Sequence, residues 1–182
     1  ALPGIEVIVT DTETGQILQD GRTGMIEIRG PNVFKGYWGM PEKTAEELRD
    51  NGFFITGDLG MISEDGYVSL VGRSKDLIIS AGYNIYPKEI ELLIDCIDGV
   101  FESAVIGVPH PDLGEAVVAL IVTESGISLN LDLIMASLQK RIASFKHPKQ
   151  IIFVGELPRN SMGKVQKNVL RGSYKEIFNK KL

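Results

Sequence analysis

The sequence predicts an α+β fold in two parts, a β-rich part formed by residues 1–74 and a mixed part formed by residues 75–182. Two observations lead to this prediction. Through most of the first part, apolar residues alternate with polar ones, which is the period of a half-buried strand. After Arg73 the apolar residues recur at three- and four-residue spacing between short apolar runs, as they do in amphipathic helices that alternate with strands.

Strand patterns dominate the first part. Residues 5–9 and 25–29 alternate, and the polar, glycine-containing stretch between them is typical of a hairpin or loop. Residues 41–48 begin with proline and carry acidic side chains early, which favours a short helix. Further short apolar runs predict strands at residues 53–55, 59–63 and 67–71.

The second part alternates helices and strands. A helix that begins at Pro87 and ends before Gly99 has one apolar face, formed by Ile90, Leu93, Ile94 and Ile97. The same spacing recurs through Leu131, Ile134, Leu138 and Ile142, and a last helix is expected over residues 168–178. Strands are expected at residues 100–108, 116–122 and 151–154. Between the two parts, residues 72–76 are charged and poor in apolar side chains, which is typical of a hinge.

The charge is distributed unevenly along the chain. Residues 1–139 hold 22 acidic and 8 basic side chains, whereas residues 140–182 hold 2 acidic and 11 basic ones. The basic segment is therefore expected to meet anions. Its lysines are not interleaved with aromatic side chains that could stack on bases, so a nucleotide or phosphorylated cofactor is favoured over nucleic acid. For most of these residues taken singly, a solvated basic face is an equal alternative.

Several classes of protein are disfavoured by composition. No run of about 18 apolar residues is present, so no membrane span is expected. The single cysteine excludes an intrachain disulfide and favours a cytoplasmic location. Cys96 itself lies in an apolar helical stretch without a nearby histidine, which predicts a buried structural thiol. Because the chain starts without methionine and leads directly into a strand, we expect a piece of a longer protein.

Two polar motifs in the first part and at its end could bind a nucleotide. Asp58 follows Thr56-Gly57 after an apolar strand, where a carboxylate can accept hydrogen bonds from ribose hydroxyls or can cap its own turn. The segment Gly72–Asp76 places Arg73 and Lys75 beside an acid. Arg73 could bind a ribose or a phosphate, although a surface salt-bridge cluster is the favoured reading of that segment taken alone.

Two further motifs lie in the second part. Ser80, Ala81, Gly82 and Asn84 belong to a small-residue turn, in which Gly82 would let a narrow ligand approach, although a simple turn is favoured when it is taken alone. Lys164 follows turn-forming residues and precedes a helix, which suits a mobile loop that carries one cation to a phosphate or carboxylate oxygen. A phosphate-binding P-loop is excluded at this lysine, because Pro158 and Val165 occupy two of its required positions.

Taken in order, these motifs resemble the adenylate-forming enzymes, which include acyl-CoA synthetases, firefly-luciferase-like enzymes and peptide-synthetase adenylation domains. The resemblance covers essentially the whole chain. The segments that carry it are Leu2–Gly4, Gly36–Trp38, Pro41–Thr44, Thr56–Asp58, Gly72–Asp76 and Pro158–Lys164. Within the family, the segments Asn32–Trp38, Asn84–Glu91 and Met162–Arg171 are most similar to bacterial malonyl-CoA synthetases.

The resemblance implies a fold and an activity. Residues 1–74 correspond to the last, β-rich part of the large N-terminal AMP-binding domain, ending at the hinge, and residues 75–182 to the small mobile C-terminal lid. In the family, a carboxylate attacks the α-phosphate of ATP to give an acyl-adenylate and pyrophosphate, and coenzyme A then displaces AMP to give the thioester. The small domain swings between these two half-reactions. Malonate or a similar small acid is the implied substrate.

The resemblance also assigns residues. Its implied roles are catalytic for Lys164, nucleotide-binding for Asp58, Arg73 and Asn84, hinge for Lys75, and coenzyme A-binding for Ser80, Ala81 and Gly82, with no metal ligand. Lys164 is also the expected target of a lysine acetyltransferase. The family's Mg2+ ligands, phosphate loop and acyl pocket belong to the N-terminal domain upstream, so this chain alone is not expected to form an adenylate.

Three alternatives stay open at this point. The first is a ligase for another acid, because the segments that choose the acid are not among these residues. The second is an adenylation domain that loads a carrier protein. The third, from a different class, is a non-catalytic binding module that uses the same fold.

Overall fold

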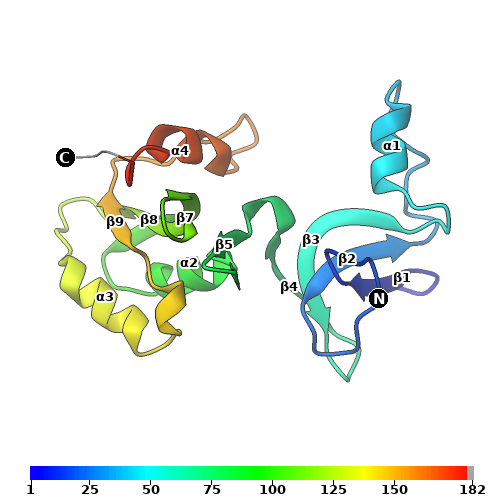
Figure 1. Ribbon diagram of the computed structural model, residues 1–182, viewed down its shortest axis with the longest axis horizontal. Helices are drawn as coiled ribbons and strands as arrows, with labels where there is room; N and C mark the ends of the chain where they lie inside the picture. Colours follow the sequence, from blue (N-terminus) through cyan, green and yellow to red (C-terminus); the bar gives the residue numbers. More distant parts are fainter. Residues whose placement is uncertain (180–182) are drawn as a thin grey trace. The chain divides into compact units, whose positions relative to one another are not determined.

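The computed structural model describes residues 1–179 and divides into two compact units, Ala1–Lys75 and Asp76–Leu182 (Figure 1). Residues 180–182 lie outside the described residues. The predicted second part and the basic segment both end with these three residues. Among the residues described, no helix is both long enough and apolar enough to cross a membrane.

The first unit is an antiparallel sheet whose strands lie in chain order. Its elements are β1 (Glu6–Thr10), β2 (Gly24–Arg29), α1 (Pro41–Glu47), β3 (Phe54–Ile62) and β4 (Val68–Arg73). The two strands predicted at residues 53–55 and 59–63 form the single strand β3. Gly57 lies within it at a φ of 72°, and the pairing with β2 shifts register between Met25 and Glu27. The polar interruption in the sequence is therefore an irregularity in one strand.

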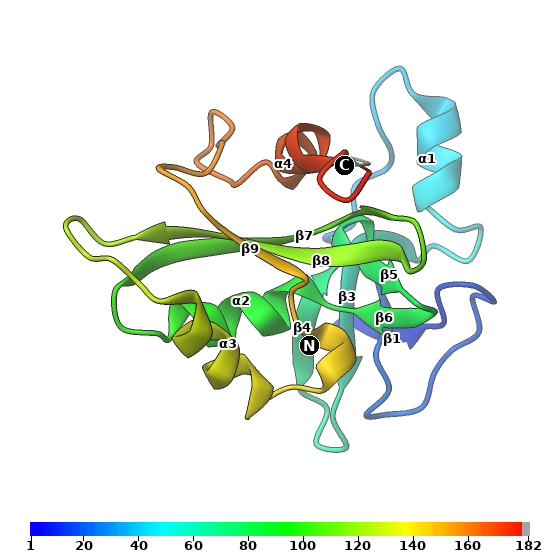
Figure 2. The same cartoon turned by 60° about the vertical axis from the view of Figure 1, so that its left-hand side comes forward.

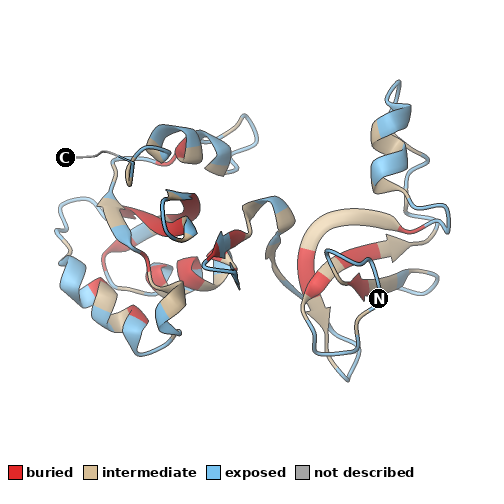
Figure 3. Ribbon diagram, in the orientation of Figure 1, coloured by how far each residue is buried: buried red, intermediate tan, exposed pale blue. Residues whose placement is uncertain are grey.

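The core of the first unit is small and contains a charge. Val9, Ile26 and Leu59 on the strands and Phe53 directly before β3 are buried. Figure 3 colours the buried parts of the chain red. Glu27 is also completely buried, although the alternation in β2 predicts it on the polar face. Its burial becomes possible because a basic side chain reaches it from the segment after α1, as described below.

The second unit is a mixed sheet in the order β6-β5-β8-β7, with β9 parallel to β8. Its strands are β5 (Ile78–Ser80), β6 (Tyr83–Ile85), β7 (Val100–His110), β8 (Gly114–Thr123) and β9 (Gln150–Phe153). Its helices are α2 (Pro87–Asp95), α3 (Leu131–Gln139), α4 (Lys167–Tyr174) and the short 3-10 helix η2 (Ser144–Lys146). A second short 3-10 helix, η1 (Ser74–Asp76), spans the boundary between the units. Strands and helices in these two arrangements confirm the predicted α+β fold.

Both faces of the β7–β8 pair are covered, which explains their nearly continuous apolar sequences. One face packs with α2 and α3 around a cluster that includes Ile90, Ile94, Val105, Ala119, Ile134 and Leu138. The opposite face packs with α4 and the segment before it around Ala104, Ile106, Val108, Leu120, Leu157 and Leu170. Figure 2 shows α2 and α3 on one side of the sheet and α4 on the other.

Several details of the second unit differ from the sequence prediction. α2 ends at Asp95, before Ile97, and α3 ends at Gln139, before Ile142. Cys96 is exposed and not buried as predicted. It is the C-cap of α2, two residues after the buried Ile94, and therefore lies about 200° around the helix from it. The last helix ends at Tyr174 and not at residue 178. Its continuation makes shorter turns instead, with Ile177 N–H donating to the Tyr174 carbonyl and Asn179 N–H donating to the Glu176 carbonyl.

Candidate functional site

The first candidate feature is an ion pair between Asp58 and Arg73. The antiparallel register of β3 and β4 places these residues opposite each other, and Arg73 Nε lies 2.7 Å from Asp58 Oδ1. Arg73 Nη1 also donates to the Thr56 carbonyl at 3.3 Å. The Asp58 and Arg73 side chains are 29% and 50% exposed, so a pair of this kind contributes little to stability. Both groups are accessible to a polar ligand.

A polar and aromatic pocket of about 540 Å³ adjoins Arg73. Its lining includes Tyr37, Glu47, Phe54, Arg73 and Lys75. The Tyr37 hydroxyl donates to Glu47, and this hydrogen bond, with desolvation and the carboxylate charge, raises the pKa of Tyr37 above its ordinary value of 10.0. Tyr37 belongs to the sequence motif Gly36–Trp38, but nothing local in the sequence indicates that its hydroxyl would contact Glu47.

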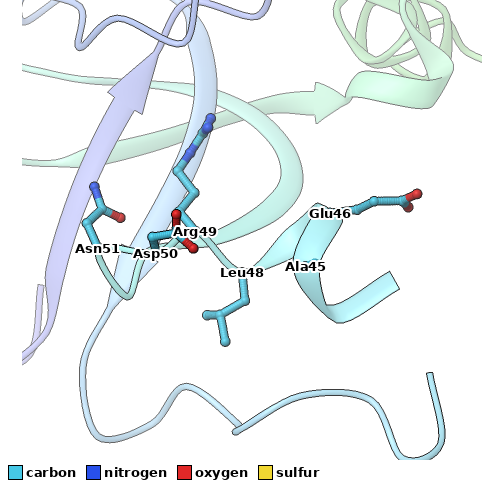
Figure 4. Close-up of a pocket in the computed structure, with 6 residues that line it drawn as sticks. All are labelled: Ala45, Glu46, Leu48, Arg49, Asp50 and Asn51. Carbon is cyan, nitrogen blue, oxygen red and sulfur yellow. The ribbon is translucent and has the colours of Figure 1, made fainter. Parts of the chain in front are cut away.

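Another hollow, of about 400 Å³, lies beside α1 and holds none of the predicted site residues. Figure 4 shows Glu46 pointing away from the turn that carries Arg49, Asp50 and Asn51. Arg49 is engaged in the sheet, where Nε and Nη2 each donate to Glu27 at 2.6 Å. This hollow therefore reflects how α1 joins the sheet. Arg49 has a structural role, because it pairs with the buried Glu27.

Lys75 lies at the junction of the two units. It is exposed within η1 and is the last residue of the first unit. The next residue, Asp76, belongs to the second unit, where it accepts a hydrogen bond from Arg171 Nη2 at 2.8 Å. The chain thus changes from one body to the other immediately after the predicted hinge residue.

The small-residue motif forms the two-residue turn between β5 and β6. Ala81 and Gly82 have φ values of 49° and 81°, which both fall in the left-handed region that such hairpin turns require. Ser80 is buried, whereas Ala81, Gly82 and Asn84 are exposed. A Cβ atom added at Gly82 would meet nothing within 4 Å, so the space beside this turn is open. Tyr83, which the sequence analysis did not single out, stacks on Phe145 with 4.5 Å between ring centroids.

Lys164 lies in a hydrogen-bonded turn between β9 and α4. Its side chain is exposed and, within residues 1–179, no carboxylate lies within 4.0 Å of its ammonium. Asn160 N–H donates to the Lys164 carbonyl at 3.0 Å, which closes the turn. The predicted loop is thus more ordered than its turn-forming residues suggest. The base of the lysine is fixed while its tip is open to solvent.

The structure brings together some of the predicted residues and separates others. Asp58 pairs with Arg73, and Ser80 to Asn84 share one hairpin. Within the second unit, Figure 2 shows the loop that leads into α4 well apart from the β5–β6 hairpin. Across residues 1–179, no three histidine, cysteine, aspartate or glutamate side chains converge in a way that could hold a metal ion.

Comparison with known proteins identifies the family. Residues 89–164 match the AMP-binding enzyme C-terminal domain. The crystal structure of ATP-bound MatB from Rhodopseudomonas palustris is similar with a TM-score of 0.92 and 60% identity, over 98% of this chain and 35% of that one. Feruloyl-CoA synthase from an Amycolatopsis species is 43% identical over 92% of this chain and 35% of its own.

A third relative has a different acid in its name. Indoleacetate–CoA ligase from Aromatoleum aromaticum is 42% identical over 87% of this chain and 31% of its own. The chain thus spans about a third of the length of these curated relatives. The motifs, the fold and these similarities agree, and the chain belongs to the adenylate-forming enzymes, with residues 89–164 as their AMP-binding C-terminal domain.

Proposed function

We propose that the chain is the C-terminal part of an AMP-forming acyl-CoA ligase, which converts a carboxylic acid, ATP and coenzyme A to acyl-CoA, AMP and pyrophosphate. One observation carries the proposal. Lys164 presents an exposed ammonium group from a turn whose backbone is held by hydrogen bonds. A cation that is fixed at its base and open at its tip suits the stabilisation of charge on a phosphate.

The proposed division of labour follows the two units. Residues 1–74 are the last, β-rich part of the large AMP-binding domain, Lys75 is the hinge residue, and residues 75–182 are the small lid. The change of compact unit directly after Lys75 supports this assignment. The Mg2+ of the reaction is held mainly by the large domain outside this chain, and we assign no residue here to it.

The nucleotide and coenzyme A roles rest on the exposed groups. Asp58 accepts hydrogen bonds from the ribose hydroxyls, and Arg73, already ion-paired with it, joins it there. Asn84 contacts the nucleotide when the lid has turned. Ala81 and Gly82 line the pantetheine channel, and the open space beside Gly82 supports this role. Ser80 is buried, so its contribution is to shape the turn.

We propose malonate, or a similar small acid, as the substrate. The support is the resemblance of three segments to bacterial malonyl-CoA synthetases, together with an identity to MatB of 60%, compared with 43% and 42% to the two ligases named above. We also propose a cytoplasmic location, which the single cysteine favours.

Turnover assays test the proposed reaction. The full-length protein that contains this chain is expected to release pyrophosphate and form acyl-CoA from malonate, ATP and coenzyme A, with lower kcat/KM for ferulate and indoleacetate. The 182-residue chain alone is expected to release none, since the acyl pocket and phosphate loop are outside it. A preference for an aromatic acid would contradict malonate, and turnover by the isolated chain would contradict the proposed division of the site.

We further propose that a lysine acetyltransferase modifies Lys164. Acetylation removes the positive charge, so adenylation is expected to fall as modification proceeds and to return on deacetylation. Lys167 is the internal control, because its side chain is 16% exposed and its ammonium lies 2.5 Å from Glu91. Peptide mass spectrometry is expected to find acetyl groups at Lys164 and not at Lys167. Modification confined to Lys167, or full adenylation by the acetylated enzyme, would exclude this regulation.

A further inference from the structure

The peptide group that joins Gly163 to Lys164 is bound by side chains at both of its polar atoms. Arg159 Nη1 donates to the Gly163 carbonyl oxygen at 2.7 Å. The Lys164 N–H donates to Asn160 Oδ1 at 2.9 Å. Because the Lys164 carbonyl also accepts from Asn160 N–H at 3.0 Å, the backbone is fixed on both sides of the Lys164 Cα atom.

The ends of this turn are anchored in the second unit. Leu157 is 4% exposed and Val165 packs against the same apolar cluster on the α4 side of the sheet. An isolated bridge pairs Arg159 with Val165, and Gly163 takes a φ of 77° to allow the turn. The lysine is thus carried by a closed turn that is tied to the core at both ends.

Arg159 is in turn held by Glu102 of β7, through an ion pair between Nη2 and Oε2. Glu102 is two residues before Ala104, so both side chains lie on the α4 side of the sheet. The neighbouring Ser103 faces the other side, where its hydroxyl donates to Asp95 of α2 at 2.6 Å. The guanidinium of Arg159 therefore joins strand β7 to the Gly163–Lys164 peptide, with one nitrogen on each.

This connection gives the fold little stability. The Arg159 and Glu102 side chains are 43% and 22% exposed, and ion pairs that are open to water contribute little to stability. Its geometric effect is larger, because a two-pronged guanidinium fixes orientation as well as distance. The contacts around Lys164 thus fit a positioning role better than a stabilising one.

We propose that Glu102, Arg159 and Asn160 are positioning residues that hold the Lys164 backbone for adenylation. The proposal rests on the function proposed above for Lys164. Stabilisation by a cation depends on its being placed before the reaction, and a displacement of about 1 Å can reduce the rate about a hundredfold. Asn160 and Arg159 act on the peptide directly, whereas Glu102 acts through Arg159.

The experiment uses the full-length enzyme and measures the two half-reactions separately. Glu102→Gln, Arg159→Ala and Asn160→Ala are each expected to lower kcat for adenylation about ten- to a hundredfold, with the KM for ATP and the melting temperature little changed. Thioester formation from supplied acyl-adenylate is expected to stay at the wild-type rate. Ser103→Ala is the matched control, because it removes a side-chain hydrogen bond from the next residue of β7 without touching the turn.

A double variant tests whether Glu102 acts through Arg159. Glu102→Gln combined with Arg159→Ala is expected to be no slower than Arg159→Ala alone. Faster adenylation by Glu102→Gln would instead indicate that the Arg159 charge acts directly, and would overturn the proposal. Wild-type adenylation in Arg159→Ala and Asn160→Ala, or an equal loss of both half-reactions, would also overturn it.

Lys164→Ala separates this inference from the proposed function. If that variant loses adenylation while the three positioning variants keep it, the positioning role is wrong and the function of Lys164 stands. If Lys164→Ala itself adenylates at the wild-type rate, the proposed function of Lys164 is wrong.

Discussion

Replacing Lys164 with alanine in the full-length enzyme is expected to slow adenylation about a hundred- to a thousandfold, the usual effect of removing one preorganised group that stabilises a transition state. Negative charge is redistributed over the phosphate oxygens as the carboxylate attacks, and an ammonium group placed beside them lowers the barrier. Thioester formation from supplied acyl-adenylate is expected to be unchanged, because we assign that step to the Gly82 turn and not to the Lys164 loop.

Two assays measure this difference. Exchange of labelled pyrophosphate into ATP reports adenylation, and release of AMP from acyl-adenylate and coenzyme A reports thioester formation. Lys140→Ala is the control, since Lys140 is another exposed lysine of the second unit and lies at the end of α3. Equal losses in the two half-reactions of Lys164→Ala, or a comparable loss of adenylation in Lys140→Ala, would contradict the assigned role.

Removing the Arg49 side chain is expected to destabilise the first unit by about 3 kcal/mol at neutral pH, since it leaves a buried carboxylate without its counter-charge. The Glu27 side chain is 1% exposed, and its two oxygens accept hydrogen bonds from Arg49 at 2.6 Å. Thr10 Oγ1 donates to Oε1 at 2.7 Å. We expect the low end of the range for buried pairs, because Arg49 itself is 40% exposed and water can reach its outer side.

The same group gives the first unit a pH dependence. Burial raises the pKa of the Glu27 carboxyl, but the hydrogen bonds from Arg49 and Thr10 together lower it more, so its folded-state pKa lies below the ordinary value of 4.5. A carboxyl with a lowered pKa stabilises the fold above its unfolded-state pKa, and this contribution is lost as the pH falls through the folded-state value. Wild-type stability should therefore decrease below about pH 4.5, and that of Glu27→Gln should decrease less.

Hydrogen exchange of the β2 amides, followed by mass spectrometry, reports the free energy of opening in this unit alone. The control is Glu6→Gln, which removes an ion pair to Arg29 whose two side chains are 41% and 59% exposed, and which should therefore change stability little. Equal costs for Arg49→Ala and Glu6→Gln would show that burial of Glu27 does not set the penalty.

Local patterns predicted much of the fold. The alternation in β1 and β2 and the spacing of Ile90 and Ile94 in α2 depend on neighbouring residues, and all three elements form within a few residues of the expected bounds. Glu27 could not be placed in the same way. On β2 it resembles a solvent-facing residue, and its burial depends on Arg49, which lies in a different segment of the chain.

In the candidate site, too, local sequence indicates the residues, whereas their surroundings depend on contacts between distant segments. The sequence brought Asp58, Arg73 and Lys164 to attention through the residue types and the resemblance. One such distant contact is the β3–β4 register that pairs Asp58 with Arg73. Glu102 carried no local signal, because its relation to the Lys164 turn exists only once β7 and the Arg159 segment have packed together.

The sheet of the second unit has a consequence for the order of events. β8 pairs with β5, β7 and β9, so the hairpin that holds Gly82 and the turn that holds Lys164 are attached to one hydrogen-bonded plate. Two groups fixed at different places on one sheet cannot occupy the same site at the same time. With the proposed roles, withdrawing Lys164 and presenting the Gly82 turn are a single movement of the second unit, so the two half-reactions exclude each other at any one moment.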